Sequence, residues 1–386
     1  MDKQDENEPL ADLVPGDAIE PGPRSEALQL CFMGDMAYER KRYDDAARLY
    51  SDAIDADPMI PELWLKRGAV KQDDGDADGA LADYGEAIRL KHDYGDALER
   101  RGMLRLGRKD LSGGIADLAE AGKVRPDDVN VWIRCAQARL ERGDFAGAVG
   151  DFTRIIRLRP DDVAAWANRA MARQKAGDSG GAIADYTEAL KRAPDQHALR
   201  FNRGITRAAM RDYAGAIADY DEVLRAQPDM AECWGQRALA KTYGGNHKEA
   251  IADFNEAIRL FPESPAVWFS RGVARAHWGD YDGAIADYTE AIRLRPDSLI
   301  YWNNRGLARH NKEDHAGAIA DYDEMLRRSP GMAGVLHNRG VSKYSAHMFC
   351  GAAKDLERAL ELSPDVNTAE FQNILAISRE RCKAGS

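Results

Sequence analysis

The chain has 386 residues, of which 44% are hydrophobic and 31% charged, a composition typical of a soluble, largely helical protein. No apolar run approaches the roughly 18 residues that a membrane-spanning helix needs, so we expect no membrane insertion. The formal net charge of -11 argues against nucleic acid or anionic lipid as a partner, because both bind basic surfaces.

Residues 1–26 form an acidic tail with eight acidic side chains against Lys3 and Arg24, and with four prolines. This composition is typical of a disordered segment. The tail has neither the basic and apolar stretches of a secretory signal nor the composition of a mitochondrial transit peptide, so we expect a cytoplasmic protein.

The five cysteines are odd in number and widely spaced, and no two of them form a C-x-x-C motif. In a cytoplasmic protein this pattern predicts isolated reduced thiols, with neither a disulfide framework nor a zinc site. The cysteines are Cys31, Cys135, Cys233, Cys350 and Cys382.

A 34-residue repeat organises the rest of the chain. The phrase Ala-Ile-Ala-Asp-Tyr begins at Ala182, Ala216 and Ala284, and a close variant begins at Ala250. Extending this frame gives ten repeats without insertion or deletion and leaves residues 367–386 as a C-terminal segment. The repeats are 27–60, 61–94, 95–128, 129–162, 163–196, 197–230, 231–264, 265–298, 299–332 and 333–366.

Each repeat predicts two antiparallel helices. Positions 4 (often Trp) and 8 (Gly or Ala) lie one turn apart on the first helix, while a small residue at position 20 and an aromatic at 24 mark one face of the second. Prolines fall between repeats, and Gly-Asp pairs such as Gly143-Asp144, Gly177-Asp178 and Gly279-Asp280 predict a turn followed by an N-cap. One hairpin cannot bury its apolar face alone, so the repeats are expected to stack.

The C-terminal segment predicts a final helix over about residues 367–383. Phe371, Ile374, Leu375 and Ile377 lie on one side of it, and charged residues follow toward its end. We expect this helix to cover the last repeat.

The pattern resembles the tetratricopeptide repeat family, whose W-x2-L-G…A-x3-F…P signature is matched most closely by repeats 163–196 and 265–298. The resemblance covers residues 27–366. It implies an all-α fold, an α-solenoid in which helix-turn-helix hairpins stack into a right-handed superhelix. The chain departs from the family pattern at position 7, mostly Arg instead of Leu, at position 11, mostly basic instead of Tyr, and at His92, which replaces a proline.

Enzymatic chemistry is not expected. Asp at position 23 with Glu at 26 recurs seven times, whereas an active site is needed once, and each Glu has a basic residue three positions later. We therefore interpret these carboxylates as an exposed face with helix ion pairs. His277, His310 and His337 fall on the ligand-facing side in the family's geometry, but they lack the spacing of metal ligands, so no metal or other cofactor is expected.

In tetratricopeptide proteins the first helices line a concave groove, and position 6 faces it. Amide side chains, interrupted by one Ser, recur at this position in the later repeats, and we call this set the amide ladder. An amide offers a donor and an acceptor to the main chain of an extended segment, and the set resembles the asparagine ladder of O-linked N-acetylglucosamine transferases. The alternative is simple solvation of the helices. The amide ladder comprises Asn168, Asn202, Gln236, Ser270, Asn304 and Asn338.

Position 6 of the earlier repeats carries Lys66, Arg100 and Arg134. These cations predict a basic end that binds an acidic segment or a terminal carboxylate, unless neighbouring acidic residues neutralise it. No three successive repeats supply the residues of the chaperone-type carboxylate clamp. The acidic tail is a candidate to occupy the basic end when no partner is bound.

The predicted function is that of a non-catalytic scaffold whose groove binds an extended segment of a partner protein or peptide. The alternative is a structural role, in which repeats of neighbouring chains assemble into homo-oligomers.

Overall fold

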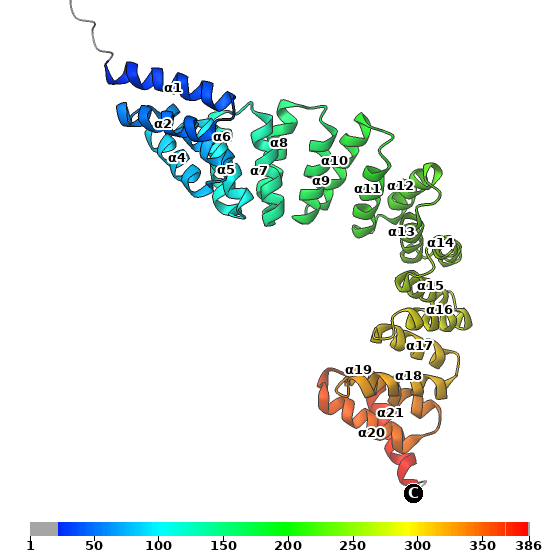
Figure 1. Ribbon diagram of the computed structural model, residues 1–386. Coiled ribbons are helices and arrows are strands. Elements are labelled where there is room, and N and C mark those ends of the chain that lie inside the picture. The colour runs from blue at the N-terminus through cyan, green and yellow to red at the C-terminus, as the bar shows by residue number, and fades with distance from the viewer. Residues whose placement is uncertain (1–21, 367, 385–386) are drawn as a thin grey trace, which may run out of the picture. The chain divides into compact units, whose positions relative to one another are not determined.

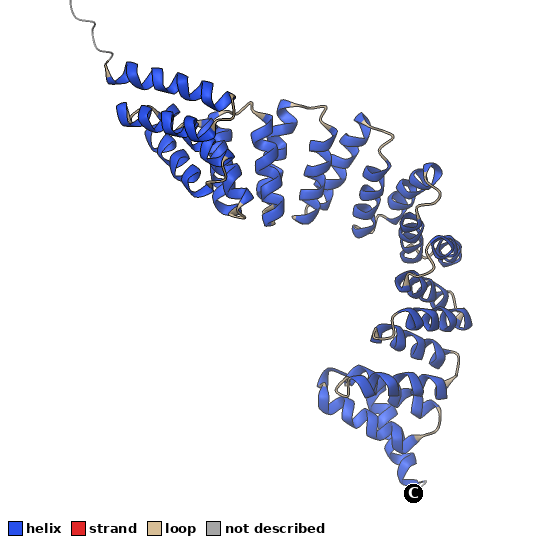
Figure 2. Cartoon of the chain, viewed as in Figure 1, coloured by secondary structure: helices blue, strands red, loops and turns tan. Residues whose placement is uncertain are grey.

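The computed structural model describes residues 22–366 and 368–384, and every regular element in this part of the chain is a helix (Figures 1 and 2). The prediction of an all-α fold is confirmed. None of the described helices is both long and apolar enough to cross a membrane. The acidic tail, apart from residues 22–26, lies outside the described residues.

The chain divides into two compact units, an N-terminal unit up to Gly177 and a C-terminal unit from Asp178 onward. The N-terminal unit contains α1 (Pro23–Glu39), α2 (Tyr43–Ala56), α3 (Pro61–Asp73), α4 (Ala77–Leu90), α5 (Gly95–Gly107), α6 (Leu111–Val124), α7 (Val129–Arg142), α8 (Phe145–Leu158) and α9 (Val163–Lys175). The C-terminal unit contains α10 (Ser179–Arg192), α11 (His197–Ala209), α12 (Tyr213–Ala226), α13 (Ala231–Tyr243), α14 (His247–Leu260), α15 (Pro265–His277), α16 (Tyr281–Leu294), α17 (Leu299–Asn311), α18 (His315–Arg328), α19 (Ala333–Ser345), α20 (Phe349–Leu362), the 3-10 turn η1 (Pro364–Val366) and α21 (Ala369–Ala384).

Helix starts follow the 34-residue frame. From α3 to α19, the first helix of every repeat begins at the first residue of that repeat, whereas α1 begins at Pro23 instead of Ala27. Proline is well suited to the first turn of a helix, where the missing N–H has no partner to lose. The N-terminal helix therefore extends four residues into the segment that the sequence assigns to the tail.

The turns that contain a Gly-Asp pair are built as these pairs predict. Gly279 has a φ of 88°, in the left-handed region that glycine tolerates. The carboxylate of Asp280 accepts a hydrogen bond from the backbone N–H of Gly283 at 2.9 Å, which caps α16. The same side-chain cap begins six other helices, at Asp76, Asp110, Asp144, Asp178, Asp212 and Asp314.

Small and aromatic residues allow close packing within hairpins such as α15–α16 and α17–α18. A Cβ atom added to Gly272 of α15 would lie 2.7 Å from Cε1 of Tyr288 in α16, and one added to Gly306 would lie 2.8 Å from the same atom of Tyr322. Real side chains do not approach so closely. In these two hairpins the aromatic residue at position 24 therefore fills the space that the small residue at position 8 leaves.

In six repeats position 4 is a tryptophan, which connects the first helix to the end of the preceding repeat. The indole Nε1 of Trp268 donates to the carbonyl oxygen of Pro262 at 2.8 Å, six residues earlier. The proline ends the previous repeat, so the bond fixes the connection between the two repeats. The same bond is made by Trp64, Trp132, Trp234 and Trp302.

The arginines at position 7, which depart from the family pattern, form ion pairs in the interior. Arg271 donates from Nη2 and Nε to Asp287 at 2.6 and 2.9 Å, and its guanidinium lies 4.7 Å from the ring centroid of Trp268. Asp287 is only 1% exposed and also pairs with Arg275 at position 11. Equivalent pairs are Arg67–Asp83, Arg101–Asp117, Arg203–Asp219, Arg237–Asp253, Arg305–Asp321 and Arg339–Asp355.

The interpretation of the recurring carboxylates as one exposed face is therefore wrong for position 23. Glu290, at position 26, is exposed enough to pair on the surface with Arg293 at 2.7 Å. Asp287, three residues earlier, is turned toward the first helix of the repeat instead. A buried carboxylate needs an ionic partner, and the two departures from the family pattern supply it.

Two repeats lack this arrangement, and in the first of them, residues 27–60, positions 7 and 23 are Met33 and Leu49. In residues 129–162, position 7 is Cys135, and Asp151 pairs with Arg139 alone, at 2.5 Å. Asp151 is 2% exposed, and burial raises its pKa in spite of Arg139. This carboxylate is therefore less well compensated than its counterparts.

The final helix covers the last repeat as predicted. Phe371 and Leu375 of α21 are 0% and 1% exposed and belong to the core cluster of the last repeats. The expectation of isolated thiols is wrong for two cysteines, because Cys350 of α20 forms a disulfide with Cys382 of α21. Their separation of 32 residues carries no sign of this pairing, since the docking of α21 decides it. Cys31, Cys135 and Cys233 are free and buried.

Candidate functional site

Position 6 takes the same place on the first helix of every repeat from α3 to α19, because each of these helices begins at the first residue of its repeat. In the C-terminal unit, α11, α13, α15 and α17 each contact the next first helix along the chain, and α19 contacts the final helix α21. The amide ladder follows these helices from Asn202 to Asn338, while Asn168 belongs to α9 of the N-terminal unit. Asn202 is exposed, and Gln236, Ser270, Asn304 and Asn338 are half-buried.

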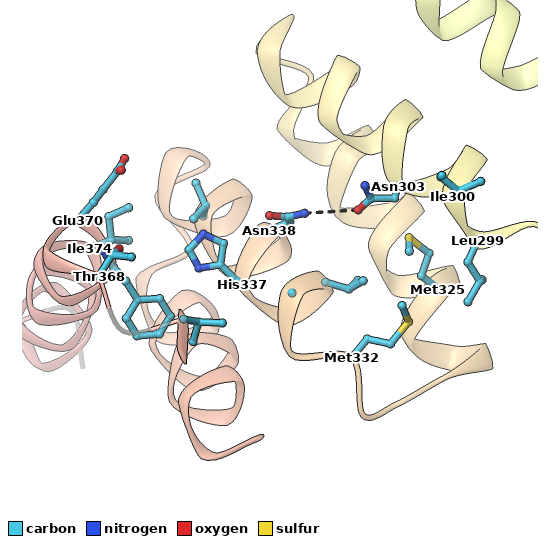
Figure 3. Close-up of a pocket in the computed structure, with 15 residues that line it drawn as sticks. Leu299, Ile300, Asn303, Met325, Met332, His337, Asn338, Thr368, Glu370 and Ile374 are labelled. Atoms are coloured by element: carbon cyan, nitrogen blue, oxygen red, sulfur yellow. Dashed lines mark hydrogen bonds between the residues drawn. The ribbon is translucent and has the colours of Figure 1, made fainter. Parts of the chain in front are cut away.

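Two members of the amide ladder make hydrogen bonds within the chain. Asn304 donates from Nδ2 to the carbonyl oxygen of Ile300 at 2.8 Å, and Asn338 donates to Oδ1 of Asn303 at 3.4 Å. Figure 3 shows the side chains of Asn303 and Asn338 directed toward each other between α17 and α19. An amide has two N–H donors and an acceptor oxygen, so Asn304 and Asn338 each keep hydrogen-bonding capacity.

A cavity of about 920 Å³ lies beside Asn338, and we call it the C-terminal pocket. Residues of α17, α19 and α21 form most of its walls (Figure 3). Its lining is mostly apolar, with a few polar groups, which is the usual composition of a ligand site. The apolar lining includes Leu299, Ile300, Met325, Met332, Val335, Val341, Val366, Phe371 and Ile374, and the polar lining Asn303, His337, Asn338, Thr368 and Glu370.

His337 lines the C-terminal pocket and also packs against the final helix. Its ring stacks on Phe371 of α21, with ring centroids 5.5 Å apart and an interplanar angle of 16°. Burial lowers the pKa of His337, against the opposing influence of Glu370. The imidazole is therefore neutral at pH 7, and its stacking on an apolar ring is compatible with that state.

The three histidines that the sequence singled out do not gather. His277 packs edge-on against His247, with centroids 5.5 Å apart, and Nδ1 of His310 lies 3.0 Å from Oγ of Ser342. Only His337 lines the C-terminal pocket. Within residues 22–366 and 368–384, no group of three or more His, Cys, Asp or Glu side chains is arranged to hold a metal ion.

The cations at position 6 of the N-terminal unit are largely compensated. Nζ of Lys66 lies 2.8 Å from Asp35 and 2.9 Å from Glu62. Burial acts to lower the pKa of Lys66, but the hydrogen bonds to Asp35 and Glu62 raise it above its usual value. Lys66 is thus a charged member of a local cluster, and an acidic ligand would have to compete with two carboxylates for it.

Arg134 is compensated in the same way, by Glu99 of the preceding repeat. Glu99 also accepts from Arg125 at 2.5 Å. A second cavity, of about 600 Å³, lies here and is lined by both signs of charge. Its lining residues are Leu65, Gln72, Asp96, Glu99, Arg100, Met103 and Arg134. The structure therefore favours the expectation that neighbouring acidic residues neutralise this end.

The sequence predicts the amide ladder, but its pattern did not predict the C-terminal pocket. The pocket combines α17, α19 and α21, whose relative placement depends on packing between repeats. The apolar residues Ile300 and Val341 were an available signal, because they lie one helical turn from Asn304 and Asn338 and so share the helix face of the amide ladder.

Comparisons with known proteins agree with this architecture. A family profile described as tetratricopeptide repeat matches residues 33–70, 134–173, 167–231, 236–298 and 279–333, which together make up more than half of the chain. A search of curated protein sequences gave no match.

Among solved structures, that of Naa15/Naa10 bound to HypK-THB is similar with a TM-score of 0.57 and 14% identity, over 92% of this chain and 66% of that one. The C-terminal part of a TPR repeat-containing protein from Cytophaga hutchinsonii is similar with a TM-score of 0.55 and 18% identity, over 63% of this chain and 98% of that one. At these identities the likeness concerns the fold alone. Together with the 34-residue register and the stacked helical hairpins, the profile match shows that the chain belongs to the tetratricopeptide repeat family, whose members generally bind other proteins and are generally not enzymes.

Proposed function

We propose that this protein binds an extended segment of a partner protein through the amide ladder, and that the C-terminal pocket takes one bulky apolar side chain of that segment. The observation that carries the proposal is that Asn338 belongs both to the amide ladder and to the lining of the pocket. Amides that hold the main chain therefore lie directly beside a cavity that can select a side chain.

The chemistry of the two parts is complementary. Asn202 and Gln236 have no side-chain hydrogen bond within the part of the chain that the structure describes, so their amides are open to a ligand. Each net hydrogen bond contributes about 0.5–1.5 kcal/mol, and burial of one large apolar side chain about 1.5–3 kcal/mol. A few such bonds and one buried side chain offset the ordering of a flexible segment, which costs about 2–5 kcal/mol, and leave modest affinity.

The proposal gives the cations of the N-terminal unit a smaller role. Lys66 and Arg134 already have carboxylate partners at short distance, and an acidic ligand would have to displace them. Arg100 is exposed and is the cation among these three to which we assign a contact with an acidic group of the partner.

A peptide library tests the proposal while the natural partner is still unidentified. Random 12-residue peptides are selected on the protein, and the best binders are measured by calorimetry. We expect peptides with a bulky apolar residue, whose affinity falls about tenfold in Asn304→Ala/Asn338→Ala and in Ile300→Glu. Phe261→Glu is the matched control, because Phe261 and Ile300 are both 56% exposed but only Ile300 lines the pocket. Equal binding to all variants would reject the site.

Self-association is a second candidate, supported by the outer surface of α1. Leu28, Phe32 and Met33 are 52%, 66% and 51% exposed on this helix. An apolar patch on a terminal repeat is a surface on which a second chain can stack. Light scattering over a range of concentrations tests this, with Phe32→Lys as the variant. A monomer at every concentration would exclude it.

A further inference from the structure

The two halves of α21 are held by different interactions. Its first half is packed through Phe371 and Leu375, which are buried against α19 and α20. After Ser378 the helix has mainly exposed side chains. Among the described residues, the disulfide of Cys382 with Cys350 and the ion pair of Arg379 with Glu357 at 2.8 Å connect this second half to α20.

The ion pair is a weak link compared with the disulfide. Arg379 and Glu357 have side chains that are 54% and 44% exposed, and exposed ion pairs contribute little in water. The disulfide is therefore the stronger of these two restraints on the last turns of α21.

The disulfide is accessible, whereas the other cysteines are not. Cys350 is exposed and Cys382 half-buried. Cys31, Cys135 and Cys233 are all buried. An external thiol therefore reaches this one bond and no other cysteine of the folded chain, because exchange requires direct attack on a sulfur atom.

We propose that the Cys350–Cys382 disulfide is a redox-sensitive link, whose reduction releases the second half of α21 from α20 and loosens the wall of the C-terminal pocket. The reductant is a dithiol. Its thiolate attacks Sγ of Cys350, the sulfur–sulfur bond breaks, and Cys382 leaves as a thiolate that takes up a proton. The second thiol of the reductant then displaces Cys350, so two electrons pass to the pair and the dithiol becomes a disulfide.

The link acts on the pocket through α21 itself. Glu370, Phe371 and Ile374 line the pocket and lie one to three turns before the restrained half of the helix. When the last turns fray, the first half loses the helical continuation that stabilises it, because helix formation is cooperative. The effect on ligand binding rests on the proposed function, whereas the effect on α21 does not.

Amide hydrogen exchange of the full chain tests the proposal, with and without dithiothreitol. We expect protection in residues 379–384 to fall at least tenfold on reduction, while α17 is unchanged. The variant Cys350→Ser/Cys382→Ser should show the low protection in both conditions. Binding of a selected peptide should weaken severalfold on reduction in the wild type and not respond in the variant.

Several outcomes overturn the proposal. Five titratable thiols in denatured protein that was never reduced would show that the link does not form. Unchanged exchange in residues 379–384 would show that the disulfide does not restrain the helix. Faster exchange with unchanged peptide affinity would show that the disulfide has no effect on the pocket. A peptide library that yields no binder in either state rejects the proposed function, and the exchange result still decides whether the link restrains α21.

Discussion

Arg305 donates from Nε and Nη2 to both carboxylate oxygens of Asp321, at 3.0 and 2.7 Å, across the two helices of one repeat. The same guanidinium donates to Oγ1 of Thr289 in the preceding repeat at 3.1 Å. One side chain therefore connects two helices of its own repeat with the second helix of its neighbour. The arrangement recurs along the chain, so these arginines help to fix the spacing between successive repeats.

Removing this arginine should destabilise the protein strongly. In Arg305→Leu, Asp321 keeps Arg309 at 2.9 Å but loses the bidentate partner, and it remains 1% exposed. Breaking a buried pair costs about 3–5 kcal/mol, and the remaining partner places the expected loss near 3 kcal/mol. Urea denaturation followed by circular dichroism measures it. Arg293→Ala, which breaks an exposed pair with Glu290, is the control and should cost under about 1 kcal/mol.

Asp151 should tolerate neutralisation better than its counterparts. Asp219 is paired with Arg203 and Arg207, whereas Asp151 has Arg139 alone. A hydrogen bond to a charged group contributes about 1.5–3 kcal/mol, so Asp219→Asn should cost at least about 1 kcal/mol more than Asp151→Asn at pH 7. Equal losses in the two variants would contradict the difference in pairing.

The Asp151→Asn variant should also show a defined pH dependence. Burial raises the pKa of Asp151 above its unfolded value, so the folded state binds the proton more tightly. The free-energy cost of burying the ionised Asp151 carboxylate lowers the stability of the wild type at neutral pH. This cost disappears as the pH falls through the raised pKa, because the folded chain then takes up a proton. The stability of Asp151→Asn relative to wild type should therefore decrease between pH 7 and pH 4, as measured by chemical denaturation at each pH.

His337 should make the C-terminal repeats sensitive to mild acid. Burial lowers the pKa of this group, so below pH 6.5 the unfolded chain takes up a proton that the folded chain does not. The folded chain therefore keeps its full stability above pH 6.5 and loses stability as the pH falls toward the pKa that His337 has in the folded state. Hydrogen exchange of α21 at pH 7 and pH 5 measures the effect after correction for the intrinsic rate. His337→Phe, which keeps the stacking on Phe371, should lessen the response.

Thiol reactivity should separate two classes of cysteine. Burial raises the pKa values of the Cys135 and Cys233 thiols to about 12, so almost no thiolate is present at pH 8. After reduction, Cys350 and Cys382 should react with Ellman's reagent within minutes and the buried thiols only on unfolding. Mass spectrometry of the labelled peptides identifies the sites, and rapid labelling of Cys233 in the native protein would contradict the burial of that residue.

The local architecture follows from the sequence because its signals lie within one repeat. The fixed 34-residue period predicts the helix starts, and the Gly-Asp pairs predict caps such as that of Asp280 on Gly283. The small residue at position 8 and the aromatic at 24 predict contacts such as Gly306 with Tyr322. The helix starts, the caps and these contacts depend on backbone preference or on packing within one hairpin. None of them depends on the geometry between repeats.

The side-chain partners could not be inferred in the same way. Asp287 has the spacing of an exposed helix carboxylate, and only the packing of α15 on α16 places Arg271 beside it. The charge of Lys66 looks available to a ligand in the sequence, whereas in the structure the neighbouring repeat brings Asp35 within 2.8 Å. Spacing along one helix gives the face on which a residue lies but not which residue of another helix meets it.

The sequence by itself determined that this is a tetratricopeptide repeat chain, because periodic apolar, small and turn-forming residues specify a hairpin and its repetition. The tertiary structure decided which charges are buried, that Cys350 joins Cys382, and that an apolar pocket lies beside Asn338. These features depend on the rotation and offset of each helix against its neighbours. Close packing of many side chains sets those quantities together, and no single position of the repeat encodes them.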